Sequence, residues 1–327
     1  MEGTVTGSAA LPDSGIDVVI PVYRPDGKLR TLLTRLMRQT RKPDRILIVN
    51  TEQELFDESY VEGLDNVTVL HITKDEFDHG GTRHMAAMKL RGTFLLFLTQ
   101  DAVPADSHLI ESLYAAFADE KVCAAYARQL PAKDCSVLER YTRSFNYGEE
   151  SRIKTQEDLG ELGIKTYFCS NVCAMYRRST YEELGGFVRR AIFNEDMIFA
   201  GRLIQSGRAV AYCADAKVVH SHNYSNMQQF RRNFDLGVSQ AKHPEIFEGV
   251  PSEGEGIRMV RQTAGYLLHS GQPWLLPELV IKSGCKFVGY RLGKAYQKLP
   301  RKVILFCTMN RSYWKPDQND GNRTGID

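Results

Sequence analysis

The amino-acid sequence predicts an α/β fold with a mostly parallel central sheet flanked by helices, followed by a helical C-terminal extension. First, short β-branched runs alternate with helical patterns in the first half of the chain, which is typical of βαβ units. Second, residues 93–98 form an apolar run that stops abruptly at polar residues, as a buried strand does at the edge of such a sheet. Third, the pattern changes after about residue 250 to a helical seam with basic flanks.

The composition is that of an ordinary globular protein. The chain has 327 residues, of which 43% are hydrophobic and 25% charged, enough for one large domain and an appendage. A net charge of +2 gives no reason to expect a nucleic-acid partner. Residues 1–15 are small and polar, and no run of about 18 apolar residues occurs, so we expect a flexible N-terminus and a cytoplasmic or peripheral protein.

The first half of the chain alternates strands with helices. Leucines recur at helical spacing from Leu29 to Leu36, which predicts an amphipathic helix ended by Pro43. The pair Gly80-Gly81 opens a further helix that continues through Met88. Strands are expected at residues 16–22, 46–49, 67–72 and 93–98.

The second half begins with a helix at residues 109–117 and a strand at residues 122–128. Residues 131–165 are polar and irregular, and we expect them to be an insertion over the site. A strand at 172–177, a helix at 195–206 and a strand at 209–220 complete the domain. The sequence therefore predicts an N-terminus at 1–15, a main domain at 16–250 and an extension at 251–327.

The extension is predicted to be an amphipathic, cationic helix. Apolar residues from Ile281 to Leu299 repeat at alternating four- and three-residue steps, which predicts a narrow seam on one helix. Between Glu278 and Asp317 the chain has nine basic residues and no acidic one. This pattern favours docking on an anionic membrane surface, and a homo-oligomer interface is the alternative.

Three groups of polar residues carry the chemistry. Asp101 follows the apolar strand, the pair Glu195-Asp196 opens a helix, and His220 and His222 close a later strand. A carboxylate and an imidazole from different strand ends can hold Mg²⁺ or Mn²⁺ against phosphate oxygens. A second carboxylate can then act as a general base, for which Asp196 is favoured and Glu195 is the alternative.

Each of these residues also has a structural interpretation. Asp101 could be a turn residue, and Asp196 could favour the helix macrodipole, as Glu195 could equally well. One of the two histidines could simply be buried and the other exposed. A helix opening at Gly80-Gly81 has backbone N–H groups that suit a phosphate, with Arg83 adding charge, although a tight turn is an equal alternative.

Over roughly residues 16–250 the sequence resembles family 2 glycosyltransferases with the GT-A fold, a Rossmann-like arrangement. The segments around Asp78-His79-Gly80-Gly81, Gln100-Asp101-Ala102 and His220-Ser221-His222 are particularly similar to the rhamnosyltransferase branch. The other matching segments are Val19-Ile20-Pro21-Val22-Tyr23, Gly81-Thr82-Arg83-His84-Met85-Ala86, Leu184-Gly185-Gly186-Phe187 and Asn194-Glu195-Asp196.

The resemblance implies an inverting transferase that moves L-rhamnose from dTDP-rhamnose to a lipid-linked glycan in bacterial surface polysaccharide synthesis. It implies that Asp196 is the general base, and that Asp101 binds the metal and diphosphate with His220 or His222. Gln228-Gln229-Phe230-Arg231-Arg232 is faintly similar to an element of polysaccharide synthases, which would place Arg231 near the diphosphate. The donor-binding residues expected are Pro21, Tyr23, Asn50, Glu52, Gly81, Arg83, Gln100, Asp101 and Arg231.

Two departures from the family pattern widen the alternatives. Many relatives have two carboxylates at the end of the apolar strand, where this chain has one, in Gln100-Asp101-Ala102. Many also have an aspartate that binds the nucleoside at the end of the second strand, where this chain has Asn50-Thr51-Glu52. Another UDP- or dTDP-hexose donor and a catalytically silent carbohydrate-binding relative therefore stay open. A nucleotidyltransferase would need a basic, glycine-rich first loop, which Pro21-Val22-Tyr23-Arg24-Pro25 is not.

Overall fold

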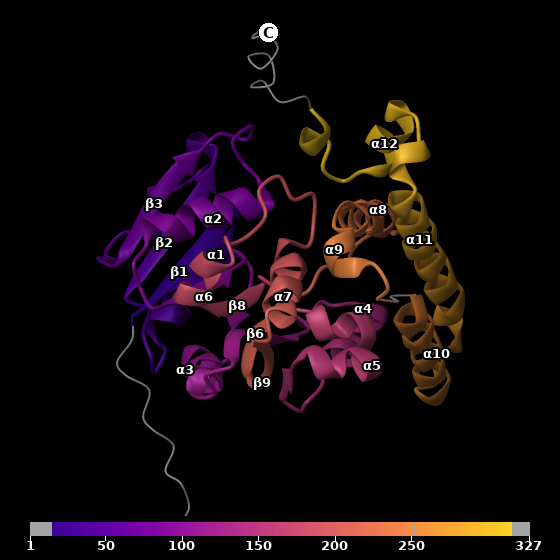
Figure 1. Ribbon diagram of the computed structural model, residues 1–327, viewed down its shortest axis with the longest axis horizontal. Helices are drawn as coiled ribbons and strands as arrows, with labels where there is room; N and C mark the ends of the chain where they lie inside the picture. The colour runs from indigo at the N-terminus through magenta and orange to yellow at the C-terminus, as the bar shows by residue number, and fades with distance from the viewer. Residues whose placement is uncertain (1–14, 251–252, 316–327) are drawn as a thin grey trace, which may run out of the picture.

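The computed structural model describes residues 15–250 and 253–315, so nearly all of the expected flexible N-terminus lies outside the described residues. Figure 1 shows the sheet at one side of the molecule, helices on both of its faces, and the C-terminal helices stacked at the other side. The predicted α/β class is confirmed. The strands are β1 Ile16–Tyr23, β2 Arg45–Thr51, β3 Val67–Ile72, β4 Phe94–Leu98, β5 Val103–Pro104, β6 Val122–Leu130, β7 Arg152–Lys154, β8 Cys173–Arg177 and β9 Ala209–Val219.

These strands form one sheet in the order β3-β2-β1-β4-β8-β6-β9-β5, with β7 pairing to β9. β1, β2, β3 and β4 run parallel, as do β6 and β9. β8 runs antiparallel between β4 and β6, a reversal that the apolar pattern of residues 172–177 could not reveal. The carboxyl ends of β1, β2, β4, β6 and β9 consequently share one edge of the sheet, where ligands bind in open α/β sheets.

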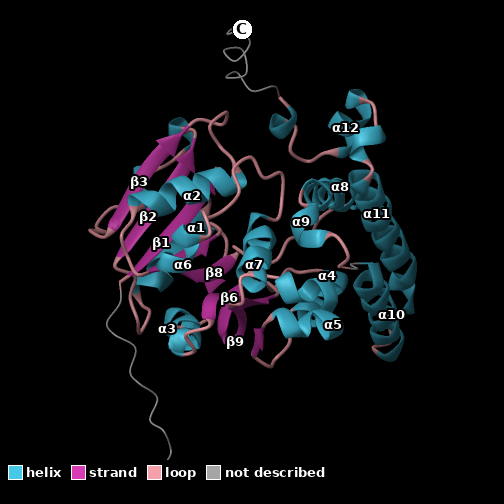
Figure 2. Cartoon of the chain, viewed as in Figure 1, coloured by secondary structure: helices cyan, strands magenta, loops and turns pink. Residues whose placement is uncertain are grey.

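Alternating side chains of the strands build a core on each face of the sheet. On β1, Val18 and Ile20 pack with the leucines of α1, whereas Val19 faces α2 and α7. Figure 2 shows the helical layers. The helices are α1 Gly27–Met37, α2 His79–Lys89, α3 Leu109–Ala115, α4 Val137–Asn146, α5 Leu159–Leu162, α6 Arg178–Glu183, α7 Glu195–Gln205, α8 Asn226–Lys242, α9 Pro244–Phe247, α10 Glu253–His269, α11 Leu276–Lys294 and α12 Arg301–Cys307.

The expectation of an irregular insertion at residues 131–165 was wrong. The segment contains α4, the short strand β7 and α5. Ser136 caps α4 by accepting a hydrogen bond from the Glu139 N–H, and Lys154 is buried against Tyr126 and Phe168. The polar composition was misleading because α4 has a mixed surface, with Leu138 as its only buried residue.

The expectation of one helix along the seam from Ile281 to Leu299 was also wrong. Helix α11 ends at Lys294, and Pro300 precedes the separate helix α12. The seam residues do not share one environment, since Ile281 is exposed while Leu292 packs into a cluster with Phe234. The seam is therefore not a continuous stripe available to a second chain.

The C-terminal helices pack on the main domain through glycines. A Cβ atom on Gly289 or Gly293 of α11 would lie 2.2 Å or 2.1 Å from the carbonyl oxygens of Phe230 and Phe234 on α8. A Cβ on Gly237 of α8 would lie 2.4 Å from the Tyr290 oxygen in the same way. The absence of side chains lets the two helix backbones approach closely, so the position of α11 is set by α8.

The Gly293→Ala substitution is expected to destabilise the protein by about 1–3 kcal/mol, because the methyl group meets backbone that can move only with its helix. Gly284→Ala on the same helix is the control. Its Cβ meets nothing within 4 Å, and alanine favours a helix by about 1 kcal/mol, so stability should rise or stay unchanged. Chemical denaturation measures both variants, and equal stability of the two would contradict this packing.

Candidate active site

A cavity of about 390 Å³ lies at the carboxyl edge of the sheet, between the strand ends and helices α4, α7, α8 and α11. Among the residues expected at the site, Arg83, Glu195, Asp196, His220 and His222 line this cavity. Thr99 at the end of β4 also lines it, two residues before Asp101. The three groups of polar residues singled out in the sequence therefore meet at one place.

Asp101, His220 and His222 form a cluster at the wall of the cavity: the two histidines line the cavity, whereas Asp101 is not a lining residue but contacts both of them. The Nε2 atoms of His220 and His222 lie 3.6 Å and 3.3 Å from the two carboxylate oxygens of Asp101. One ligand atom from each residue lies within 4.8 Å of the others, close enough to share one metal ion. Burial lowers the pKa of His220 to about 3, so this imidazole is neutral, as a metal ligand must be.

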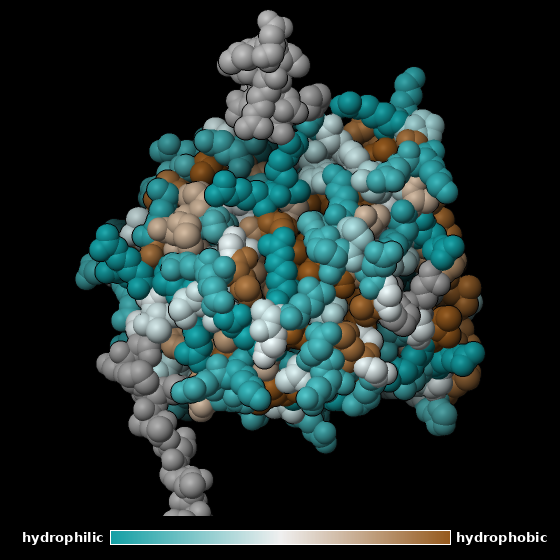
Figure 3. All heavy atoms as spheres, viewed as in Figure 1, coloured by the Kyte–Doolittle hydropathy of each residue, from teal (hydrophilic) through white to brown (hydrophobic). Residues whose placement is uncertain are grey.

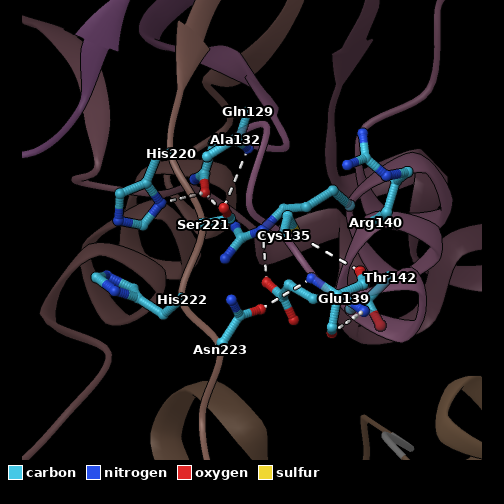
Figure 4. Close-up of polar contacts among 12 residues, drawn as sticks. Gln129, Ala132, Cys135, Glu139, Arg140, Thr142, His220, Ser221, His222 and Asn223 are labelled. Atoms are coloured by element: carbon cyan, nitrogen blue, oxygen red, sulfur yellow. Dashed lines mark hydrogen bonds and ion pairs between the residues drawn. The ribbon is translucent and has the colours of Figure 1, made fainter.

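Gln129 at the end of β6 orients His220 (Figure 4). Its Oε1 accepts a hydrogen bond from Arg143, and its Nε2 donates to the Ser170 hydroxyl, which establishes which amide atom faces the histidine. Nδ1 of His220 lies 3.1 Å from that Oε1 and must be the protonated nitrogen. The lone pair of Nε2 consequently points toward Asp101, an arrangement common behind metal-ligating histidines.

The segment after β9 alternates between the cavity and its support (Figure 4). His220 and His222 line the cavity, whereas Ser221 and Asn223 accept hydrogen bonds from backbone N–H groups of residues 132 and 136, before and at the start of α4. The amide of Asn223 also donates to the carbonyl oxygen of residue 134. The segment that the sequence suggested was irregular is thus the support that holds both histidines.

Glu195 and Asp196 begin α7 and differ in environment. Glu195 is buried and pairs with Arg83 at 3.1 Å. Burial acts to raise the pKa of Glu195, but Arg83, His79 and a hydrogen bond from Asn171 outweigh it and lower the pKa. Burial and the neighbouring charge of Glu195 raise the pKa of Asp196. Of the two, only Asp196 has the environment of a general base that works near neutral pH.

Asp196 is held in place by two backbone hydrogen bonds. Its oxygens accept from the N–H groups of Asn171 at 2.9 Å and Met197 at 2.8 Å. The preceding residue, Asn194, has a left-handed backbone with φ of 64°, which turns the chain into α7. The Nδ2 atom of Asn194 is buried beside the cavity and has no partner among the described residues. Strained residues of this kind concentrate at functional sites.

For Gly80-Gly81, where a phosphate site and a tight turn were equal alternatives, the structure shows that the Gly81 N–H is already occupied. The Asp78 carboxylate caps α2 by accepting a hydrogen bond of 2.6 Å from the Gly81 N–H, and it also accepts one from Arg190. A Cβ on Gly80 would lie 2.0 Å from the Val188 carbonyl oxygen. The glycines therefore allow close contact with the loop before α7, while Arg83 reaches the cavity from the same helix.

The residues expected to bind the nucleoside lie at the same sheet edge but outside the cavity. Gln100 bridges to β1, accepting from the Tyr23 N–H at 2.8 Å and donating to the Tyr23 carbonyl oxygen. Pro21 pairs in register with Val49 on β2. At the end of β2, Asn50 donates to the Glu52 carbonyl oxygen, and its own buried Oδ1 has no partner among the described residues. Glu52 accepts from the Lys74 N–H.

Arg231 does not line the cavity, contrary to expectation. It donates to the Phe306 carbonyl oxygen at 3.1 Å and lies over the Phe306 ring, on the side of α8 that faces α12. Arg232, one residue later, lines the cavity, as does Lys286 from α11. Helix periodicity could have favoured Arg232 over Arg231 only if the face of α8 that is turned toward the cavity had been known. Glu139, Arg143 and Gln129 were also missed.

The sheet topology, with a candidate metal-ligand cluster and a carboxylate pair at its carboxyl edge, fits the GT-A class of transferases. The model for "Glycosyl transferase family 2" matches residues 17–185, and the chain belongs to this family. The family suggested by the sequence motifs is thereby confirmed.

Two curated relatives match almost the whole chain. The O-antigen chain rhamnosyltransferase RfbN of Salmonella typhimurium is 39% identical over 94% of this chain and 98% of its own length. The O-antigen chain rhamnosyltransferase WbaN of Salmonella anatum is 38% identical over 94% of this chain and 98% of its own length. Both matches extend through the C-terminal helices.

A solved structure shares the fold. The mannosyltransferase PcManGT from Pyrobaculum calidifontis, in complex with GDP-Man and Mn²⁺, superposes with a TM-score of 0.54 at 16% identity. The match covers 90% of this chain and 84% of that chain. At this identity the likeness supports the GT-A architecture alone.

Proposed function

We propose that this chain is an inverting rhamnosyltransferase that moves L-rhamnose from dTDP-rhamnose to a lipid-linked glycan in bacterial surface polysaccharide synthesis. The observation that carries the proposal is that one cavity is lined both by Asp196, a carboxylate whose pKa is raised, and by the two histidines of a candidate metal-ligand cluster that Asp101 completes. The choice of rhamnose rests on the names of the two Salmonella relatives. UDP- and other dTDP-hexoses are the competing donors.

The Asp101 cluster fits a divalent cation. One carboxylate and two imidazoles are suitable ligands for Mn²⁺. Mg²⁺ would be bound by the carboxylate together with phosphate oxygens. Asp101, His220 and His222 would hold the ion, with Gln129 fixing the ring of His220. When bound, such an ion supplies positive charge against a departing diphosphate. The fold neighbour PcManGT was solved with Mn²⁺, which favours the same kind of ion here.

Asp196 acts as the base in the proposed reaction. Its ionised oxygen accepts the proton of the acceptor hydroxyl, which then attacks the anomeric carbon from the face opposite the diphosphate. This single displacement inverts the anomeric configuration and needs no covalent nucleophile. Glu195 stays paired with Arg83, and its negative charge keeps Asp196 basic enough to take the proton.

A donor screen tests the specificity. A nucleotide sugar that binds the folded protein raises its melting temperature in proportion to its affinity. With Mn²⁺ present, dTDP-rhamnose should raise the melting temperature more than UDP-glucose, dTDP-glucose or GDP-mannose at equal concentration. A larger rise with another donor would reassign the sugar, and no rise with any donor would favour a catalytically silent relative.

We further propose that the protein binds the cytoplasmic face of the cell membrane through α11 and α12. Apolar side chains are exposed there, including Val280 at 66% and Phe287 at 56%, and Figure 3 shows apolar residues gathered on the side of these helices. The basic residues of the extension have no acidic residue among them from Leu279 to Pro316. In the described part of the chain no helix could span a bilayer, so docking would be peripheral.

Charge reversal of exposed lysines should release the protein from anionic vesicles. Reversing Lys294, Lys298 and Lys302 to Glu removes three cations, each contributing about 1 kcal/mol, so binding should fall by more than about 100-fold. The control reverses Lys42, Lys89 and Lys121, which are exposed on the sheet side of the molecule, and gives the same net charge. Co-sedimentation with phosphatidylglycerol vesicles is the measurement.

Equal loss in both triple variants would show only a general charge effect. Unchanged binding in the α11–α12 variant would contradict membrane docking. If that variant instead changed the sedimentation coefficient in the absence of lipid, the surface would be a subunit interface.

A further inference from the structure

Helix α11 brings a lysine from the C-terminal extension to the candidate active site. Lys286 lines the cavity that contains Asp196, His220 and His222, and it also lines a smaller adjoining cavity between α4, α10 and α11. The close contacts between the glycines of α11 and helix α8 hold Lys286 at this place, because Gly289 lies three residues after it on the same helix. The extension therefore belongs to the wall of the site and is more than an appendage to it.

Most other cations near this cavity already have anionic partners. Arg83 pairs with Glu195 at 3.1 Å, Arg143 with Glu139 at 2.8 Å, and Lys282 with Glu278 at 2.6 Å. Lys286 is half-buried, and no ion pair or hydrogen bond joins it to another of the described residues. Among the described residues its ammonium group has no direct ion pair, although the Glu139 carboxylate, which pairs with Arg143, acts on it from nearby.

The surroundings of Lys286 are unfavourable for a cation without a ligand. Burial lowers the pKa of Lys286, the carboxylate of Glu139 opposes this effect, and the positive charges of Lys282, Arg143 and Arg232 add to it. Glu139 is itself shared with Arg143. An anion that entered the cavity would relieve this excess of positive charge.

Arg232 is the second cation without an ion pair on this wall. Its guanidinium lies over the rings of Phe193 and Tyr224, at 4.5 Å and 5.5 Å from their centroids, and it makes no ion pair among the described residues. Arg232 and Arg143 also act on His220 and His222, which places their charges near the metal-ligand cluster. The excess positive charge thus extends from α11 and α8 toward Asp101.

We propose that Lys286 binds the diphosphate of the nucleotide donor and of the nucleoside diphosphate that leaves, in the cavity that it shares with Arg232 and the histidines. The inference rests on the proposed function, since it assigns a ligand to the same site. A diphosphate fits better than a single carboxylate, because two cations from separate helices face one cavity. The C-terminal extension therefore takes part in donor binding.

Calorimetric titration of the full chain with dTDP in the presence of Mn²⁺ tests the proposal. Lys286→Met keeps the length of the side chain and removes its charge, and it should weaken dTDP binding by about 10- to 100-fold. The affinity for dTMP should change much less, and Lys286→Arg should bind dTDP nearly as the wild type does. The control is Lys294→Met, an exposed lysine of the same helix, which should leave dTDP affinity unchanged.

Several outcomes would overturn the inference. These are equal dTDP affinity in Lys286→Met and wild type, an equal loss in Lys294→Met, or an equal loss for dTMP. Lys286→Gln replaces Lys286→Met if the thermal unfolding transition shows that the first variant is misfolded. If the wild type binds none of dTDP, UDP and GDP, the proposed function itself fails. If it binds one of them and Lys286→Met binds it equally, only the inference fails.

Discussion

The Asp196→Asn variant is expected to lower the rate of sugar transfer by about 10²- to 10⁴-fold, the usual contribution of a general base. The amide keeps the size of the side chain and can still accept the hydrogen bonds from Asn171 or Met197, but it cannot take a proton from the acceptor. Binding of dTDP should stay close to that of the wild type, because Asp196 is not among the metal-ligand cluster.

The measurement is single-turnover transfer together with dTDP titration. The control is Asp215→Asn, an exposed aspartate on β9. A rate within about threefold of the wild type would contradict the role of Asp196 as a general base. A large loss of dTDP affinity would show that Asp196 contacts the donor instead.

The pH dependence gives a second readout of the same prediction. The pKa of Asp196 is raised to about 7 by burial and by the charge of Glu195. Since the base must be ionised, the transfer rate should rise with pH, reach half of its maximum near pH 7 and level off about one pH unit higher. In Glu195→Gln the neighbouring negative charge is gone, so the acid limb should move to lower pH. A limb that stays in place, or moves to higher pH, would contradict this coupling.

The Asp101→Asn variant is expected to lose most of its affinity for Mn²⁺, because it removes the only carboxylate of the cluster. Removing a residue that only supports a metal ligand typically lowers metal affinity by about 10- to 100-fold. Gln129→Leu is such a change, because Gln129 supports His220. The loss of Mn²⁺ affinity in Asp101→Asn should exceed the loss in Gln129→Leu. Transfer activity should fall with Mn²⁺ affinity, since the two histidines alone leave the charge of a diphosphate poorly neutralised.

Mn²⁺ titration by electron paramagnetic resonance compares the variants directly. The expected order of Mn²⁺ affinity is wild type, then Gln129→Leu, then Asp101→Asn. Asp106→Asn, a variant in the loop after β5, is the control. An Asp101→Asn protein that bound Mn²⁺ as tightly as the wild type would move the metal elsewhere.

Most of the sheet could be predicted from the sequence because its strands bury both faces. Residues such as Val18, Val19 and Phe97 are fully buried, so their runs are continuously apolar and bounded by polar residues. The same rule marked Asp101, since a polar residue directly after such a strand stands at the sheet edge. The sequence of β8 contains no signal for its antiparallel direction, because the direction of a strand is decided by the chain connections and not by composition.

The supporting residues of the site could not be predicted because their contacts join distant segments. Gln129 touches His220 across 91 residues, and Lys286 reaches the cavity only because Gly289 lets α11 approach α8. A glutamine at a strand end and a lysine on a basic helix have ordinary local explanations. Arg231 was chosen over Arg232 for the same reason, since the orientation of α8 depends on its packing.

The central claim is that this chain transfers rhamnose by using the Asp101 cluster and Asp196 at one cavity. It is tested most directly by incubating the protein with Mn²⁺, dTDP-rhamnose and a lipid-linked glycan acceptor, and by determining the products by mass spectrometry and NMR. The prediction is one added rhamnose per acceptor, release of dTDP, and an anomeric configuration opposite to that of the donor. Absence of any sugar transfer or dTDP release with active, folded protein, or a product that retains the donor configuration, would contradict it.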